Sequence, residues 1–262
     1  MHTAKPLAGH RLLLTNDDGI DAPGLAVLED IANALCDDVW VVAPDSEKSG
    51  AGHSISLHTP IRLRLRGERR WAVQGTPTDC VLMAFHELMT AQRPTVVLSG
   101  VNNGANLAED ISYSGTCAAA MEGTLLGLRS VALSMLRGPD GSARWEAARQ
   151  HLPSLLAGLL RQDHWPDGSF ININLPDATP AEISGVRVTR QGRRPPGAFS
   201  IDPRLDGRNQ PYFWVKIAYP EGGRTPGTDL HAIEERAISV TPVQLDFTNE
   251  AWRGRLAEAL RG

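Results

Sequence analysis

Residues 12–20 read LLLTNDDGI, an apolar run that ends at two adjacent aspartates and a glycine. Neighbouring side chains on a strand point to opposite faces, so Asp17 and Asp18 can converge only where the strand has ended and the chain turns. Gly19 permits that turn, because glycine adopts backbone conformations that other residues avoid. Two carboxylates at the carboxyl end of a strand in an open α/β sheet indicate a hard divalent cation, although a solvated acidic turn would have the same local sequence.

The patterns that follow this segment predict an α/β fold. Short apolar runs predict strands at residues 10–16, 38–43, 95–98, 130–136 and 170–175. Helical periodicity predicts helices at residues 22–36, 76–91, 116–128 and 143–161. This alternation is typical of a mainly parallel sheet with helices on both faces. An alternating segment at residues 61–66 and an apolar one at residues 71–73 predict a half-exposed hairpin beside that sheet.

The character of the chain changes after residue 185, where proline and glycine become frequent. Strand-like segments are found at residues 186–189, 212–218 and 237–241, and residues 250–260 have the pattern of a closing helix. We therefore expect one domain over residues 1–262, with a core at residues 1–185 and a β-rich C-terminal extension at residues 186–262. We also expect this extension to serve as an arm that contacts another subunit.

Length, charge and composition argue against several classes of protein. The 262 residues are 42% hydrophobic and carry a formal net charge of −4, so we expect a buried core and no nucleic-acid polymer as partner. The three cysteines include no CxxC pair, which argues against a disulfide framework and a zinc site. No apolar run approaches the roughly 18 residues of a membrane span, and residues 1–10 lack a signal-peptide core. We expect a cytoplasmic protein.

Three polar loops follow predicted strands, at residues 16–19, 44–54 and 99–116. Because such loops meet at one edge of a doubly wound sheet, their side chains are expected to converge. Asp17 and Asp18 contribute charge, and Ser49 and Asn102 contribute neutral oxygens. This ligand set suits one Mg²⁺ or Mn²⁺ ion and leaves coordination positions for water and a substrate oxygen.

An anion site is expected beside this metal site. Ser114, Gly115 and Thr116 precede an alanine-rich helix, and the unpaired N–H groups of a helix start bind anions. Simple N-capping by Ser114 is the alternative. The loop before them carries residues that either cradle a phosphate or shape a tight turn, namely Gly100, Asn103, Gly104 and Asn106. His53 has two interpretations. It could act as an acid or contact the substrate, or it could be a structural or merely exposed loop residue.

Common nucleotide and hydrolase motifs are absent. The sequence has no G-x-S-x-G at a strand end, no P-loop and no G-x-G-x-x-G after the first strand. A serine hydrolase, a P-loop enzyme and a dinucleotide-binding protein are therefore not indicated.

Several sequence blocks form a recognisable set. They are TNDDGI (15–20), VAPD (42–45), Ser49 with GHS (52–54), GTPTDC (75–80), SGVN (99–102), SGT (114–116), TRQ (189–191) and SVTP (239–242). Taken together, these blocks resemble the survival protein SurE family. The resemblance covers nearly the whole chain. It implies a Rossmann-like, SurE-like domain that hydrolyses nucleoside 5′- and 3′-monophosphates with Mn²⁺ or Mg²⁺, and that in some members also trims short polyphosphate. It also implies a homodimer or homotetramer in which the C-terminal arm is exchanged.

The resemblance assigns roles to particular residues. The family's metal ligands fall on the set chosen above: Asp17, Asp18, Ser49 and Asn102. Its phosphate-binding positions fall on Asn106, Ser114, Gly115 and Thr116. The chain departs from the family pattern at Asn103, where a larger or basic residue is frequent, and at Tyr113, where a histidine or another residue is frequent. Both departures are expected to affect substrate preference without removing a ligand.

These residues predict a mechanism of positioning and charge neutralisation. One divalent ion per subunit is expected to bind a phosphate oxygen and to lower the pKa of a bound water, with Asp17 or Asp18 orienting that water. Three alternatives stay open at this point. Asp17 could act as a nucleophile through an aspartyl-phosphate, the protein could be a nucleotide sensor without turnover, or it could be a structural oligomer with solvated acidic loops.

Overall fold

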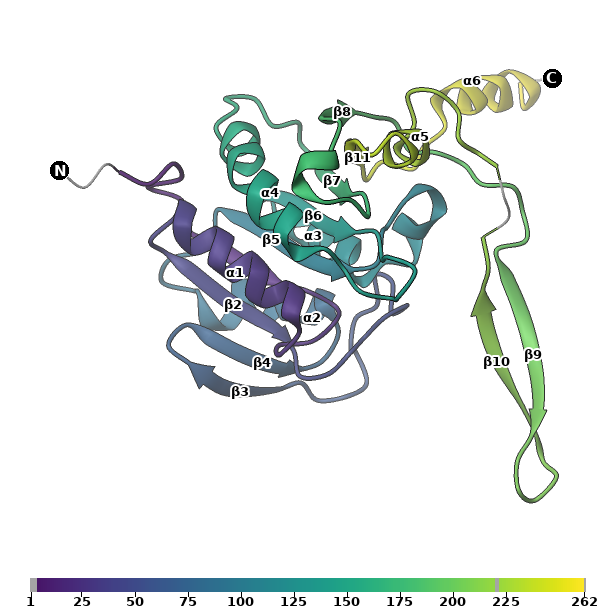
Figure 1. The fold of residues 1–262 in the computed structure, drawn as a ribbon, viewed down its shortest axis with the longest axis horizontal. Coiled ribbons are helices and arrows are strands. Elements are labelled where there is room, and N and C mark those ends of the chain that lie inside the picture. Colours follow the sequence, from purple (N-terminus) through teal and green to yellow (C-terminus); the bar gives the residue numbers. More distant parts are fainter. Residues whose placement is uncertain (1–3, 220–221, 262) are drawn as a thin grey trace.

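The computed structural model describes residues 4–219 and 222–261, which form a nine-stranded sheet covered by helices and a separate two-stranded hairpin (Figure 1). The strands of the large sheet are β1 (Leu12–Thr15), β2 (Val39–Pro44), β3 (Arg62–Gly67), β4 (Arg70–Gln74), β5 (Val96–Asn103), β6 (Arg129–Met135), β7 (Ser169–Leu175), β8 (Val186–Val188) and β11 (Ile238–Gln244). Their spatial order is β3-β4-β2-β1-β5-β6-β7-β11-β8.

The centre of the sheet is parallel. Strand β1 pairs in parallel with β2 and β5, and the parallel pairing continues through β6 to β7. The β3–β4 and β7–β11 pairs are antiparallel. The prediction of a mainly parallel α/β sheet with additional C-terminal strands is confirmed.

Helices cover both faces of this sheet. They are α1 (Pro23–Leu35), α2 (Pro77–Met83), α3 (Gly115–Leu125), α4 (Trp145–Leu160) and α5 (Asp229–Glu234). Helices α1 and α4 pack together on one face, and α2 and α3 pack together on the other (Figure 1). Strand β1 lies between these layers with Leu12, Leu13 and Leu14 fully buried, which is why the apolar run of the first segment contains no polar residue.

Local sequence signals account for the starts of the helices near the site. Pro23 begins α1, where the missing N–H of proline has no cost. Thr76 and Asp79 form a capping box at the start of α2. The predicted helix at 76–91 is shorter as an α-helix, because it changes to a π-helical turn at Ala84–Leu88.

The order of the strands produces a switch point beside β1. From β1 the chain moves to β2, which pairs with one edge of β1. It later enters β5, which pairs with the other edge of β1. Crevices at such points, outside the carboxyl ends of the strands, are where ligands bind in open α/β sheets. Asp17 and Asp18 follow β1 directly, so the topology places them at this crevice.

The structure differs from the sequence prediction at the end of β5. The sequence predicts a strand at 95–98 and a polar loop at 99–116, but β5 continues to Asn103 after an irregularity in its pairing with β6. Asn102 and Asn103 pair there with Ser134 and Met135. Their backbone is therefore part of the sheet, which gives this side of the crevice a rigid support.

The C-terminal part divides between the sheet and two projecting elements. Strands β8 and β11 extend the large sheet, whereas β9 (Phe199–Leu205) and β10 (Pro211–Ile217) form a hairpin that extends away from the body (Figure 1). Helix α6 (Glu250–Ala259) also projects from the body, near the C-terminus. The sequence analysis predicted β10 and α6 but missed β9 and α5. None of the helices formed by the described residues combines the length and hydrophobicity needed to span a bilayer.

Candidate active site

Asp17 connects the end of β1 to two other segments. Its carboxylate Oδ1 accepts a hydrogen bond from the Thr116 hydroxyl at 2.5 Å, and its backbone carbonyl accepts one from the Lys48 N–H at 2.7 Å. The residue is only 4% exposed. The loop after β1, the loop after β2 and the start of α3 therefore meet at this aspartate, as the topology requires.

Burial perturbs the protonation of Asp17. Loss of solvent raises the pKa of its carboxyl to about 6, the Thr116 hydroxyl opposes this rise, and the neighbouring charge of Asp18 adds to it. None of the ion pairs among residues 4–219 and 222–261 includes Asp17 or Asp18. The carboxylate is thus buried without a protein cation, an arrangement that a bound metal ion would stabilise.

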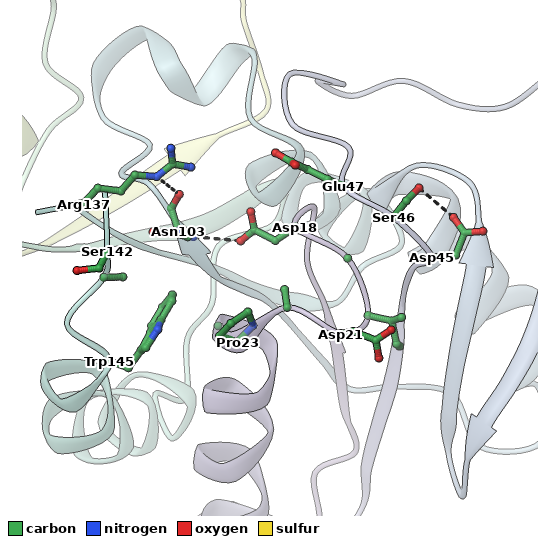
Figure 2. Close-up of a pocket in the computed structure, with 15 residues that line it drawn as sticks. Asp18, Asp21, Pro23, Asp45, Ser46, Glu47, Asn103, Arg137, Ser142 and Trp145 are labelled. Carbon is green, nitrogen blue, oxygen red and sulfur yellow. Dashed lines mark hydrogen bonds between the residues drawn. The ribbon is translucent and has the colours of Figure 1, made fainter. Parts of the chain in front are cut away.

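Asp18 turns toward the end of β5. Its Oδ2 accepts a hydrogen bond from the Asn103 N–H at 3.1 Å (Figure 2). Partial burial raises the pKa of the Asp18 carboxyl, while that N–H and the nearby Arg137 guanidinium oppose the rise. The two aspartates therefore face different neighbours, Asp17 the start of α3 and Asp18 the end of β5.

Ser49 and Asn102 retain oxygens that can bind a cation. The Ser49 hydroxyl donates to Glu47 Oε1 at 2.9 Å, and the Asn102 amide nitrogen donates to the Gly104 carbonyl at 2.7 Å. Both side chains use hydrogens in these contacts, and the oxygen of each keeps lone pairs for a ligand. Their sequence neighbours Lys48 and Asn103 bond to Asp17 and Asp18 respectively.

The donor set is one of hard oxygens. Within the described parts of the chain, no group of three or more His, Cys, Asp or Glu residues is arranged to hold a metal. The predicted set contains only two such residues, Asp17 and Asp18, and its other two members are the neutral side chains of Ser49 and Asn102. Two carboxylates, an amide oxygen and a hydroxyl fit Mg²⁺ or Mn²⁺ better than a soft ion.

The start of α3 lies directly against Asp17. A Cβ atom placed on Gly115 would stand 2.7 Å from the Asp17 Cβ and 2.9 Å from its Oδ2. The Ser114 hydroxyl accepts the Cys117 N–H at 3.0 Å and so caps the helix, as the simple N-cap alternative requires. The cap uses the Cys117 N–H, and the Thr116 backbone N–H bonds to the Asp17 carboxylate. The positive end of the α3 dipole therefore lies next to this carboxylate, with two of the first N–H groups of the helix already engaged.

Asn106 has a different environment from the other predicted phosphate ligands. It is buried, its amide nitrogen donates to the Ser134 hydroxyl at 2.7 Å, and its backbone N–H donates to Asn174 Oδ1 at 2.8 Å. Among the hydrogen bonds of the described residues, none joins Asn106 to Asp17 or Asp18. The structure thus places this side chain at the ends of β6 and β7 and does not bond it to the two aspartates.

His53 contacts α3 toward its C-terminal end. Its Nε2 lies 2.9 Å from Glu122 Oε2, two turns along α3, and the preceding Gly52 N–H donates to the Tyr113 carbonyl. The loop after β2 is thereby attached to α3 at two points. A structural role explains these contacts without assigning His53 to the chemistry.

A cleft of about 670 Å³ opens beside Asp18. Figure 2 shows Asp18, Asn103, Arg137 and Trp145 around it, with Glu47 on the opposite side. Arg137 donates from Nε to the Asn103 carbonyl at 2.5 Å. The cleft therefore begins at one of the predicted metal ligands and continues toward the start of α4.

Comparisons with known proteins show the family of this chain. A family model described as Survival protein SurE matches residues 12–197. The chain belongs to the SurE family. A protein named 5'-nucleotidase SurE from Methylobacterium radiotolerans is 51% identical over 251 residues, which cover 95% of this chain and 98% of that protein. A second protein named 5'-nucleotidase SurE, from Bradyrhizobium diazoefficiens, is 51% identical over 255 residues, which cover 96% of this chain and 100% of that protein.

A solved structure supports the same assignment. The crystal structure of the SurE protein from Aquifex aeolicus is similar to this fold, with a TM-score of 0.81 and 35% sequence identity over 96% of this chain and 100% of that one. The SurE resemblance stated from the sequence blocks is confirmed. The metal and phosphate roles of single residues stay predictions.

Three residues of this SurE chain lie at or near the site without a sequence signal that would have identified them. Glu122 was read as part of an alanine-rich helix, and Trp145 as an ordinary residue at a helix start. Arg137 lies in a loop of no recognisable pattern. Arg137 and Trp145 follow β6 in the sequence, whereas Asp18 follows β1. Only the fold brings them to the same cleft.

Proposed function

We propose that this protein is a divalent-metal-dependent phosphomonoesterase that hydrolyses nucleoside 5′- and 3′-monophosphates to nucleoside and phosphate. The observation that carries the proposal is the Asp17 carboxylate, which is buried beside the start of α3 and forms no ion pair with any residue that the structure describes. The relatives named 5'-nucleotidase SurE, which are about half identical over nearly the whole chain, support the choice of a nucleotide as substrate.

Asp17, Asp18, Ser49 and Asn102 are the residues that would hold one Mn²⁺ or Mg²⁺ ion. They fit a hard cation because, among the described residues, no cation faces the buried Asp17 carboxylate, the Asp18 carboxylate forms no ion pair, and two neutral oxygens keep lone pairs. When bound, the ion would neutralise charge on the phosphoryl group and acidify a nearby water molecule.

The chain's own groups supply binding and orientation. The positive end of the α3 dipole, together with the Gly115 N–H, would bind non-bridging oxygens of the phosphoryl group, and the lack of a side chain at Gly115 allows close approach to Asp17. Asp17 or Asp18 would orient the attacking water. Asp17 is a poor nucleophile for an aspartyl-phosphate, because it is 4% exposed and its Oδ1 already accepts the Thr116 hydroxyl.

Phosphate release from AMP tests this function. We expect release from 5′-AMP and 3′-AMP with Mn²⁺ and a fall to background with EDTA, and a parallel assay with short polyphosphate defines the substrate range. Calorimetric titration with Mn²⁺ and with AMP separates the alternatives. Tight AMP binding without release would indicate a nucleotide sensor, and the absence of any Mn²⁺ uptake would contradict the metal site.

We also propose that the protein assembles as a homodimer or homotetramer through exchanged C-terminal arms. Every residue of β10 is exposed, and apolar side chains occupy both faces of the hairpin. They are Phe199, Ile201, Leu205, Tyr212, Phe213, Trp214, Val215 and Ile217. Exposed apolar area of this extent is typical of a protein interface, and a second copy of the chain offers the same hairpin. A cytoplasmic location stays a prediction.

Removal of the hairpin is expected to lower the assembly state. Replacing residues 199–217 by a short glycine-serine linker should reduce the mass measured by light scattering to that of a smaller oligomer or monomer, while the far-ultraviolet signal of the helices remains. The matched control is Leu57→Ser, which removes an exposed apolar side chain outside the arm. An unchanged mass after removal of the hairpin would contradict the exchanged arm.

A further inference from the structure

We propose that the cleft beside Asp18 holds the nucleoside half of the substrate, with the base against Trp145. The proposal rests on the function proposed above and adds the part of the chain that selects a nucleotide over other phosphate esters. It assigns Trp145 as the residue that contacts the base and Arg137 as the cation beside the phosphate and sugar.

The position of the cleft connects it to the reacting phosphate. Asp18 and Asn103 line it, and the Asn103 N–H bonds to the Asp18 carboxylate at 3.1 Å. A phosphate held near Asp17, Asp18 and the start of α3 would therefore place its ester group at the entrance of this cleft. The volume of about 670 Å³ falls within the range of small-ligand sites and exceeds the need of a phosphate alone.

Trp145 supplies an aromatic wall. It is the first residue of α4, it lines the cleft, and Figure 2 shows its ring between Pro23 and Ser142. The ring is partly buried and packs on the backbone of α1, because a Cβ on Gly24 would lie 3.0 Å from its Cη2 atom. A ring held in this way can stack on a base at little cost in side-chain freedom.

The charges around the cleft favour a neutral nucleoside over a long polyanion. Four carboxylates line it, from Asp18, Asp21, Asp45 and Glu47, whereas Arg137 is the one cationic side chain among its lining residues. Carboxylates accept hydrogen bonds from ribose hydroxyls and base amino groups, and they repel a chain of phosphates. Arg137 bonds to the Asn103 carbonyl through Nε, and its positive charge acts on the Asp18 carboxylate, so it is the cation of the cleft that lies beside the proposed phosphate position.

A second hollow is less suited to this role. It has a volume of about 280 Å³ and lies at the base of the hairpin, next to Tyr113 and Arg194. The Arg194 guanidinium there bonds twice to Asp110 and lies 3.9 Å over the Tyr219 ring. Arg194, Glu109 and Asp110 are already paired with one another there, and they contribute to the packing of the hairpin base.

AMP and ribose 5-phosphate test the proposal, because they differ only by the base. We expect Trp145→Ala to lower kcat/KM for AMP by about tenfold or more and to leave kcat/KM for ribose 5-phosphate unchanged. Arg137→Gln should lower both values by similar factors. Trp165→Ala is the matched control, since Trp165 is another partly buried tryptophan that packs on the same core but lines a different hollow.

Other outcomes would overturn the proposal. Equal loss for both substrates, or no loss, in a Trp145→Ala protein with an unchanged melting temperature would remove the base from this cleft. A selective loss of AMP turnover in Tyr113→Ala would place the base in the second hollow. Trp145→Leu repeats the test if the alanine variant does not fold. If the wild-type protein cleaves neither ester, the proposed function fails, and calorimetric binding of the same two ligands to wild type and Trp145→Leu still decides the role of the cleft.

Discussion

The Asp17→Asn variant is expected to lose phosphate release by at least about a thousandfold and, in the absence of metal, to be more stable than the wild type at pH 8. Activity is expected to fall because the substitution removes one of the two proposed charged metal ligands and leaves a neutral amide beside the proposed phosphate position. Stability rises because the same carboxylate is buried without a cation in the metal-free protein.

The sign of the stability change follows from the pKa. Burial, with a smaller contribution from Asp18, raises the pKa of Asp17 from 3.8 to about 6 in the folded protein. A carboxyl whose pKa is higher in the folded protein than in the unfolded chain contributes fully to folding stability at pH values below its unfolded pKa. That contribution is lost as the pH rises through its folded pKa. At pH 8 the ionised Asp17 carboxylate therefore lowers the free energy of unfolding by up to ~3 kcal/mol. An asparagine at this position carries no charge and has no such cost.

Melting temperatures in EDTA at pH 5 and pH 8 measure this effect. The advantage of Asp17→Asn over wild type should be large at pH 8 and smaller at pH 5, and added Mn²⁺ should raise the melting temperature of the wild type only. Asp163→Asn is the control, because Asp163 is exposed. A variant that is less stable than wild type at pH 8, or an equal advantage at both pH values, would contradict a cation site at Asp17.

The centre of the fold could be predicted because its signals are local. Strand β1 is buried on both faces, so its residues form an unbroken apolar run, and Pro23 and Ser114 mark helix starts by their own chemistry. The loops that follow parallel strands meet at one edge of the sheet by geometry alone. The contacts of Asp17 with Lys48 and Thr116 follow from that rule without a motif for either pair.

The elements and site residues that the sequence did not predict depend on contacts between segments that are distant in the chain. Strand β9 includes Pro203 and has its residues in solvent, so neither alternation nor burial marks it before its pairing with β10 is known. Trp145 reaches the cleft through the packing of α4 on α1, and Arg137 through its hydrogen bond to the Asn103 carbonyl. The Asn106 side chain could not be placed either, because its partners Ser134 and Asn174 come from β6 and β7.

Gly115→Ala is expected to reduce activity by about a hundredfold with little loss of folding stability. The added Cβ would stand 2.7 Å from the Asp17 Cβ and 2.9 Å from Oδ2, closer than side-chain atoms approach one another. Asp17 cannot move away freely, because its Oδ1 accepts the Thr116 hydroxyl and its carbonyl accepts the Lys48 N–H. Either the carboxylate or the start of α3 must therefore shift, and both define the proposed phosphate position.

Helix propensity acts in the opposite direction, which makes the result diagnostic. Alanine is favoured over glycine within a helix by up to about 1 kcal/mol, so strain at Gly115 and improved propensity partly cancel in the unfolding free energy. Gly158→Ala in α4 is the matched control, because nothing lies within 4 Å of its Cβ position. We expect unchanged activity in that control and weakened Mn²⁺ binding and AMP turnover in Gly115→Ala. Full activity in Gly115→Ala would show that the contact between α3 and Asp17 does not position the phosphate.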